Sequence, residues 1–489
     1  MGRLRSINYA VVFRVVGWLV AMEGLFLTVP LITSIIYSET DWKGFAIAAG
    51  TCLASGTLLS TLIKPHSREI AKREGFLLTA LVWIFLSGFG MLPFMLCEHP
   101  VGVSDAYFEA MSGFTTTGAS VIPTVANMGH GMLIWRAEMN WIGGMGIILF
   151  TLAVVPMLNH TGGMQMFNAE VTGITHEKLR PRISQTAKNL WLVYVVLTIA
   201  LVLLLWAGPM NFFESVCHGF STISTGGFST RDGSVGAWDS TYIDVVITVF
   251  MLLGGVNFAM LYLIAAGRAR EAFRNEVLRT LLWVITVFYV LFVASILIHG
   301  QYTGWKSVTI DPLFLVVSTI TSTGLTVNNF ENWGPFVLAL VFFLMFFGSC
   351  AGSTSGGAKL DRLIVLIKTV RNEIYKCVHS NSVLAVRVND KVMAPELVSK
   401  VIAFLCLYVL VIAVGGAVLT MFGIPVVDSF FSAFSCVGNT GLGAGVTGYG
   451  GGYEILPDPA KWVLSLIMLT GRLEIFTVLI LLSPGFWRK

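Results

Sequence analysis

Four short stretches rich in hydroxyl side chains and glycine interrupt an otherwise apolar chain. They read TTTGAS (115–120), FSTISTGGFST (220–230), TSTGLT (321–326) and GNTGLG (438–443). Hydroxyl and carbonyl oxygens are neutral groups that can replace the water around a monovalent cation, whereas calcium and magnesium favour carboxylates. None of the four stretches contains a carboxylate. Their chemistry is therefore that of holding a monovalent cation.

The spacing of these stretches predicts four internal repeats. Their glycines, taken as Gly118, Gly226, Gly324 and Gly441, recur at intervals of roughly 100 residues. Asp105, Asp311 and Asp428 each lie 13 residues before the glycine of their repeat, and Asn211 lies 15 residues before Gly226. We expect each to cap a helix of about ten residues, which spans only half a bilayer.

Each repeat should therefore enter the membrane from outside, stop midway and return as the TG stretch. Four such returns around one axis would line a pore, with the carbonyl ends of the short helices favouring a cation. The alternative is that Thr-Gly pairs serve helix packing or turns, but four copies in phase favour the pore. The candidate filter residues are Thr116, Thr117, Gly118, Ser224, Thr225, Gly226, Ser322, Thr323, Gly324, Asn439, Thr440 and Gly441.

Composition indicates the elements that position these stretches. The chain is 55% hydrophobic and only 12% charged, which is typical of a polytopic membrane protein. Ten apolar segments read as membrane spans, one of them broken. Most of the 31 Lys and Arg then fall on one side, which places both termini in the cytoplasm and argues against nucleic-acid binding.

The predicted fold is all-α, with an N-terminal hairpin followed by four pseudo-repeats of helix, pore helix with filter loop, and helix. The predicted boundaries are 1–70 for the hairpin and 71–158, 159–268, 269–380 and 381–489 for the four pore repeats.

The eighth span is interrupted by GSCAGSTSGG (348–357) after only 14 apolar residues. Irregular backbone at this depth should face the aqueous path, and we interpret it as a gating loop. A packing kink without a gating role is the alternative, and deleting 350–356 would separate the two. A phosphate-binding loop has a lysine directly after its second glycine, whereas Ala358 stands there in this loop. This chain should therefore bind no nucleotide itself. The candidate gating residues are Gly348, Cys350, Gly352, Ser353, Thr354, Ser355, Gly356 and Gly357.

Arg472 stands in the middle of the last span. A central arginine is costly in a membrane and normally faces a cavity or a partner. We expect it to face the pore below the filter, where it contacts loop carbonyls or raises a barrier to cations. A buried pair with a carboxylate on another helix is the alternative.

The sequence resembles the Trk/Ktr/HKT superfamily of potassium transporters, and within it the Trk-type membrane subunit. SGFTTTGAS, HGFSTISTGGFST, STITSTGLT, GSCAGSTSGGAKL and GRLEIFTVLILLSPGFW carry the resemblance. It implies K⁺ as the transported ion, filter glycines at the four positions above, a homodimer in the bacterial inner membrane, and a cytosolic TrkA-type regulatory subunit that binds NAD(H), ATP or ADP. Many Trk-type members have Pro after the fourth glycine, where this chain has Leu442.

Three functions compete. The first is channel-like potassium uptake under the control of the cytosolic partner. The second is proton- or sodium-coupled symport, which usually shows paired broken helices and midplane carboxylates. The third is a membrane enzyme, but the eight histidines are scattered and form no HExxH or similar motif. The sequence favours the first.

Overall fold

The computed structural model describes residues 7–63, 70, 72–154, 183–300, 304–389, 391–448 and 452–487. Within these ranges the regular structure is helical apart from two paired strands, β1 (Arg387–Val388) and β2 (Lys391–Val392). The segment 155–182, which holds part of the predicted cytoplasmic connection between the first and second pore repeats, lies outside the described residues.

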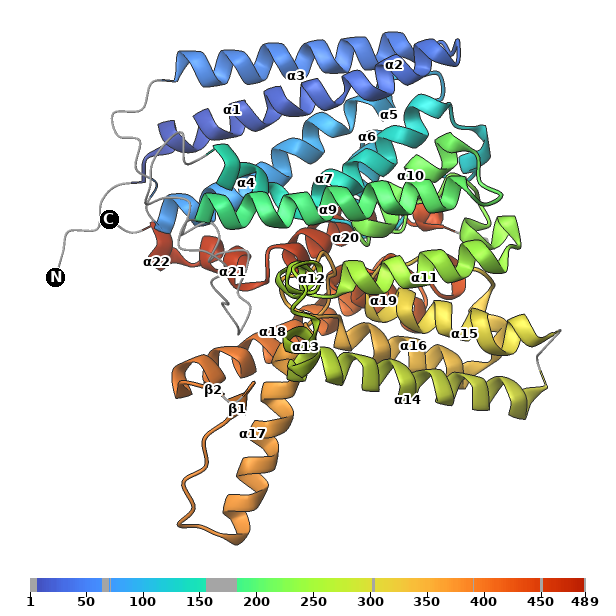
Figure 1. Ribbon diagram of the computed structural model, residues 1–489. Coiled ribbons are helices and arrows are strands. Elements are labelled where there is room, and N and C mark those ends of the chain that lie inside the picture. The colour runs from blue at the N-terminus through green and yellow to red at the C-terminus, as the bar shows by residue number, and fades with distance from the viewer. Residues whose placement is uncertain are drawn as a thin grey trace.

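The N-terminal helices form a tight hairpin. It comprises α1 (Tyr9–Phe26), α2 (Thr28–Ile36) and α3 (Trp42–Leu62), which run side by side at one edge of the molecule (Figure 1). A Cβ on Gly56 would lie 2.4 Å from the backbone nitrogen of Ala21. The absence of a side chain there lets α1 and α3 approach closely, as small residues commonly do between membrane helices.

The rest of the chain repeats one pattern four times, a long helix, a short helix, an irregular return and a second helix. The first copy has α4 (Lys72–Gly90), α5 (Leu92–Leu96), α6 (Val103–Phe114) and α7 (His130–Val154). The second has α9 (Ile183–Trp206), α10 (Phe212–Ile223), α11 (Thr241–Gly255), α12 (Phe258–Ala265) and α13 (Ala269–Arg274). The third has α14 (Glu276–His299), α15 (Trp305–Ile320), α16 (Pro335–Phe347) and α17 (Leu360–Val378). The fourth has α18 (Pro395–Thr420), α19 (Val426–Val437), α20 (Asp458–Arg472), α21 (Phe476–Leu482) and α22 (Pro484–Trp487).

The irregular returns contain short 3₁₀ turns. These are η1 (Val125–Asn127), η3 (Ser234–Trp238), η4 (Phe330–Trp333), η5 (Gly445–Thr447) and η6 (Tyr453–Ile455).

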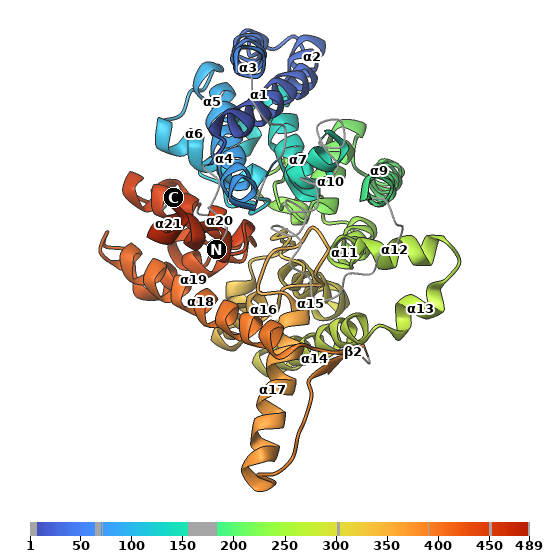
Figure 2. The same cartoon turned by 90° about the vertical axis from the view of Figure 1, so that its left-hand side faces the viewer.

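The four copies surround a common centre. Seen along the bundle, the chain passes from α4–α7 to α9–α11, then α14–α16, then α18–α20, and the last copy lies beside the first (Figure 2). Six described helices are long and apolar enough to cross a membrane, or up to eight if each bent pair is one span. The chain is thus an all-helical membrane protein, as predicted.

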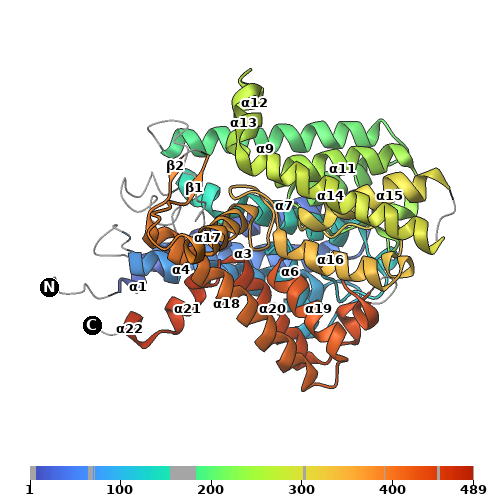
Figure 3. The ribbon, with the colours of Figure 1, turned by 90° about the horizontal axis from the view of Figure 1, so that it is seen from below.

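The second helices are broken more often than the sequence indicates. Besides the interruption after α16, α11 and α12 meet at 109°, and α20 and α21 at 114°. Helix α12 turns away from the direction shared by α9 and α11 (Figure 3). The helix α7 bends at Gly146, whose φ is 65°. Length and hydropathy conceal these breaks because the residues on both sides of each one are apolar.

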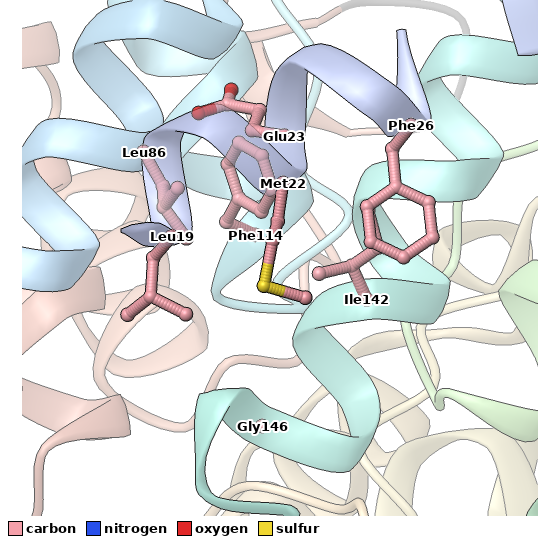
Figure 4. Close-up of a pocket in the computed structure, with 8 residues that line it drawn as sticks. All are labelled: Leu19, Met22, Glu23, Phe26, Leu86, Phe114, Ile142 and Gly146. Atoms are coloured by element: carbon pink, nitrogen blue, oxygen red, sulfur yellow. The ribbon is translucent and has the colours of Figure 1, made fainter. Parts of the chain in front are cut away.

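The hairpin packs against the first repeat around a small apolar cavity. This cavity of about 30 Å³ is lined mainly by side chains of α1, α4, α6 and α7 (Figure 4). Glu23 of α1 is buried at its edge, beside Phe114, the last residue of α6. The hairpin therefore supports the first short helix from outside the four-fold arrangement.

Candidate functional site

The four short helices deliver four nearly identical backbone turns to the centre. In each turn, the second residue after the helix has a left-handed φ of 50–54°, and these residues are Thr116, Thr225, Ser322 and Asn439. The fourth residue after the helix is a glycine with φ between 75° and 80°, and these are Gly118, Gly227, Gly324 and Gly441. Glycine is favoured there because side chains rarely adopt this conformation.

The second repeat corrects the register predicted from the sequence. Its conformational equivalent of Gly118 is Gly227, with φ of 80°, whereas Gly226 corresponds to Thr117. The matching segment is therefore Thr225–Gly227, and Ser224 corresponds to Thr115. The predicted set is one residue early in this repeat because two glycines stand side by side, and Gly226 is the one that follows a threonine.

Backbone hydrogen bonds give the same register independently. The nitrogen before each positive-φ glycine donates to the carbonyl of a serine five residues earlier, over 2.8–2.9 Å. The pairs are Thr117 to Ser112, Gly226 to Ser221, Thr323 to Ser318 and Thr440 to Ser435. A serine six residues before each glycine is thus common to all four repeats. This signal was present in the sequence and was missed.

The four segments close into a ring. A Cβ added to Gly118 would lie 2.2 Å from the carbonyl oxygen of Gly226. The same relation holds around the circle at 2.0–2.2 Å, for Gly227 with Thr323, Gly324 with Thr440, and Gly441 with Thr117. Each glycine is therefore required by a close approach as well as by its φ, and each repeat touches the next in cyclic order.

The acidic residues before the ring stabilise the short helices and their loops. With the corrected register, Glu214 joins Asp105, Asp311 and Asp428 at 13 residues before the glycine. Asn211 is an N-cap, as expected, but Asp105 and Asp428 lie in the first helical turn and Asp311 lies within α15. The negative charges of Asp105, Glu214 and Asp428 in the first helical turn are favourable.

These carboxylates already have partners, which lie in the outer loops except for the partner of Asp105 near the start of α20. Asp105 pairs with Lys461 at 2.5 Å and Glu214 with Arg231 at 2.8 Å. Asp311 accepts a hydrogen bond from Asn328, and Asp428 accepts one from the Val446 nitrogen at 3.1 Å. They therefore hold the outer loops in place around the ring.

Two further ionisable residues of the first repeat form a buried pair. Arg136 donates to Glu109 at 2.8 Å, and Glu109 also accepts hydrogen bonds from Ser120 and from the Val121 nitrogen. This pair braces the return segment that follows Gly118. The role of this pair is therefore structural.

The predicted gating loop lies against the inner ends of the short helices. The Thr354 hydroxyl bonds the carbonyls of Ile223 and Gly254, both at 3.1 Å, and meets the Thr225 hydroxyl at 3.3 Å. The Gly356 nitrogen donates to the Ser322 hydroxyl at 2.5 Å. The loop thus forms hydrogen bonds with two of the four ring segments, and Gly356 also packs closely against Gly438 and Asn439 of the fourth.

The remaining loop residues anchor it to the second repeat and to itself. The Cys350 nitrogen donates to Gly255, and the Gly352 carbonyl accepts from the Phe258 nitrogen. Ser353 and Ser355 share a hydrogen bond of 2.9 Å. Gly348, Gly352 and Gly357 have φ of 59–80°, so the turns of this loop depend on glycine.

Arg472 contacts the loop and α7 through backbone carbonyls. Its guanidinium donates to the Thr354 carbonyl at 3.0 Å and to the Gly143 carbonyl at 2.5 Å. It therefore joins the fourth repeat to the loop and to the bend region of α7. One of the two carbonyls belongs to the loop, and the role of Arg472 as a barrier in the pore stays a prediction.

One charged pair below the ring was not found from the sequence. Arg362, in the first turn of α17, forms a short ion pair with Glu474 at the break between α20 and α21. Glu474 has φ of 55°, an uncommon conformation for a residue with a side chain. No sequence signal pointed to this pair because 112 residues separate its members.

The breaks in the second helices follow from the short helices beside them. A Cβ on Gly143 would lie 1.8 Å from the carbonyl oxygen of Phe114, the last residue of α6. Gly471 stands equally close, at 2.1 Å, to the carbonyl of Val437, the last residue of α19. Glycines therefore mark where α7 and α20 pass the carbonyl end of the short helix of their own repeat.

Comparison with known proteins agrees with this architecture over almost the whole chain. Residues 43–489 match the family model TrkH, described as "Cation transport protein". The chain belongs to the TrkH family of cation transport proteins. Membership confirms the resemblance drawn from the sequence, and it makes the chain a membrane transport protein and not an enzyme.

Curated relatives and a solved structure of the TrkH family cover the chain from end to end. It is 35% identical to the Trk system potassium uptake protein TrkH of Escherichia coli K12 over 485 residues, which are 99% of this chain and 100% of the relative. It is 32% identical to TrkG of the same organism, over 99% of this chain and 100% of the relative. The crystal structure of the potassium transporter TrkH from Vibrio parahaemolyticus superposes with a TM-score of 0.89 at 33% identity, covering 99% of this chain and all of that one.

Proposed function

We propose that this protein takes up potassium across the bacterial inner membrane through a selective, channel-like pore. The observation that carries the proposal is the closed ring of four equivalent segments with positive-φ glycines. Such a ring presents neutral oxygens at fixed distances to a weakly hydrated cation. The named relatives, which are potassium uptake proteins of the Trk system, support potassium as that cation.

The filter is formed by Thr116–Gly118, Thr225–Gly227, Ser322–Gly324 and Asn439–Gly441. The short helices point their carbonyl ends at it, and each such end carries about half a negative charge. The residues around these ends are buried polar groups without carboxylates. The site therefore attracts a monovalent cation without the strong charge that would hold a divalent one.

The loop 348–357 is the gate below this filter. It obstructs the inner end of the ring through Thr354 and Gly356, and Arg472 holds it through the Thr354 carbonyl. The neutral hydrogen bonds that hold the loop against the ring contribute about 1 kcal/mol each, and the bond from the charged Arg472 guanidinium contributes about 1.5–3 kcal/mol. Opening requires that these bonds be exchanged for water, which a modest external force on α17 can drive.

The second candidate, ion-coupled symport, remains less supported. Broken helices are a feature of coupled carriers, and this chain has more of them than the sequence suggested. However, the breaks lie at the inner ends of the short helices in repeats of one orientation. The buried Glu109 carboxylate is committed to Arg136.

The assembly proposed is a homodimer bound to a cytosolic TrkA-type subunit that carries the nucleotide. Helix α17 extends away from the bundle (Figure 2), and its side chains Ile367, Ile374 and Val378 are 62–77% exposed. Apolar side chains spaced by about one or two turns form one stripe, which suits a partner helix or lipid. Both termini are assigned to the cytoplasm on the charge distribution of the sequence.

Ion competition in liposomes tests the function. Purified protein would be reconstituted in vesicles loaded with potassium, and uptake of radioactive rubidium and sodium would be followed. We expect rubidium uptake that external potassium blocks and that sodium or a pH gradient leaves unchanged, and we expect Gly118→Ser to admit sodium. Uptake that required sodium or protons would instead establish symport.

A further inference from the structure

The four ring segments differ in several side chains, and one of these differences lies directly before the positive-φ glycine. The residue before the positive-φ glycine is Thr117, Thr323 and Thr440 in three repeats but Gly226 in the second. In the first and third repeats the threonine hydroxyl bonds a threonine two residues earlier, at 2.9 and 2.8 Å. The fourth repeat has Gly438 two residues before Thr440, and the second repeat has no threonine directly before its positive-φ glycine.

The backbone of Gly226 does not require glycine. Its φ is outside the positive range found at Gly227, so a side chain would be tolerated by its conformation. What excludes a side chain is Asn140 of α7. A Cβ on Gly226 would lie 2.4 Å from Cγ of Asn140 and 2.5 Å from its Nδ2.

Asn140 therefore occupies the space where the other repeats place a threonine. It is fully buried, and its Nδ2 donates to the Ser221 hydroxyl at 3.3 Å. Ser221 is also the residue whose carbonyl holds the Gly226 nitrogen, at 2.8 Å. A side chain from the first repeat thus supports the filter segment of the second.

The equivalent positions on two other second helices carry methionine. Gly143, Gly254 and Gly471 each face the last carbonyl of their own short helix, and three residues before them stand Asn140, Met251 and Met468. Methionine at this position of a second helix thus accompanies threonine before the positive-φ glycine of the ring. Only the pair of Asn140 with Gly226 departs from it among these.

We infer that Asn140 is a positioning residue for potassium selectivity, which replaces the missing threonine behind the second filter segment. The inference rests on the proposed pore. A filter discriminates against sodium only while its carbonyl oxygens stay at fixed positions. Removing the Asn140 amide leaves the Gly226 segment without a side-chain support on this flank and frees its carbonyl to move inward.

The test is a swap of the local pair, measured as the ratio of rubidium to sodium uptake in liposomes. Asn140→Ala should lower the ratio about tenfold, which corresponds to about 1.4 kcal/mol. Gly226→Thr alone should impair uptake, because the new side chain collides with Asn140. The double variant Asn140→Met, Gly226→Thr reproduces the combination of the other repeats and should recover most of the wild-type ratio.

Recovery in the double variant separates positioning from a general loss of folding, since each single change is harmful by itself. Thr323→Gly is the matched control, because it removes the threonine of the third repeat without supplying an asparagine, and it should also lower the ratio. An unchanged ratio in Asn140→Ala, or a double variant no better than Gly226→Thr, would overturn the inference alone. A wild-type protein without selective rubidium uptake would overturn the proposed function and this inference with it.

Discussion

The ring and the second helices below it come from the same four repeats, but the four copies are nearly identical in the ring and differ from one another below it. In the ring, the four positive-φ glycines agree within 5°, and each approaches its neighbour by the same contact. Below the ring, the four second helices break differently, with a bend at Gly146, turns of 109° and 114°, and a long loop after α16.

This difference separates two physical requirements. Holding one ion by equal oxygens demands equal segments, so each repeat is constrained in the same way. Obstructing and opening a path needs a single movable part, and an irregular loop supplied by one repeat is enough. In the proposed pore, selectivity therefore depends mainly on the backbone conformation that the repeats share, whereas the proposed gate depends on what distinguishes the third and fourth.

We expect the largest effect on rubidium uptake from replacing a positive-φ glycine, since these glycines give the four ring segments the same backbone conformation. We expect Gly227→Ala to reduce rubidium uptake at least about a hundredfold, because the new Cβ would meet the Thr323 carbonyl oxygen at 2.2 Å in a left-handed backbone. Gly226→Ala should cost about tenfold or less, since the Asn140 side chain can shift. Uptake assays on both variants, with Gly324→Ala as the control, decide the register. A stronger effect of Gly226→Ala would restore the register predicted from the sequence.

Deleting part of the loop after α16 should increase rubidium uptake, whereas the glycine substitutions decrease it. Deletion of 350–356 removes Thr354 and Gly356 from the inner end of the ring, and we expect rubidium uptake to rise about tenfold, as loss of one or two hydrogen bonds would allow. The ratio of rubidium to sodium should stay near the wild-type value. An increase in leak for both ions alike would mean that the loop supports the filter and does not gate it.

The pair of Arg362 with Glu474 should stabilise the fold more than the pair of Arg231 with Glu214 above the ring. A double-mutant cycle with Arg362→Met and Glu474→Gln, followed by thermal unfolding in detergent, should give a coupling energy of about 1–3 kcal/mol because the pair is largely buried. Arg231 is 44% exposed in its pair with Glu214, and the same cycle there should give less than about 1 kcal/mol. Equal coupling in the two pairs would remove the distinction between the regions.

The smallest effect should come from the hairpin, which stands outside the repeats. In the described part of the chain, both Glu23 carboxyl oxygens are buried without a hydrogen-bond partner, and burying such a group without a partner is costly. Glu23→Met should therefore raise the free energy of unfolding by about 1 kcal/mol and leave the rubidium-to-sodium ratio unchanged. A lower melting temperature would show that the carboxyl has a function in the folded protein.

Much of this architecture could be predicted from the sequence because hydropathy and repetition record it directly. Lipid requires long apolar helices, and the equal backbone of the ring requires glycine at equal intervals. The sequence does not decide the register in the second repeat, since the adjacent glycines Gly226 and Gly227 satisfy the same pattern. Only the shared serines, such as Ser221, could have resolved it.

Contacts between distant parts of the chain could not be predicted in this way. Asn140 beside Gly226 and Arg362 beside Glu474 depend on which repeats become neighbours in space. The same holds for the breaks in the second helices, where apolar residues continue on both sides. The division of the chain into repeats at 71, 159, 269 and 381 stays a prediction.

The central claim is that the ring formed by the four segments binds a dehydrated monovalent cation. The most direct measurement is anomalous diffraction from crystals soaked in rubidium, with sodium-soaked crystals as the reference. We expect anomalous peaks on the axis between the segments that end at Gly118, Gly227, Gly324 and Gly441, and their loss when excess potassium is added. Rubidium bound elsewhere, with no peak inside the ring, would contradict the account.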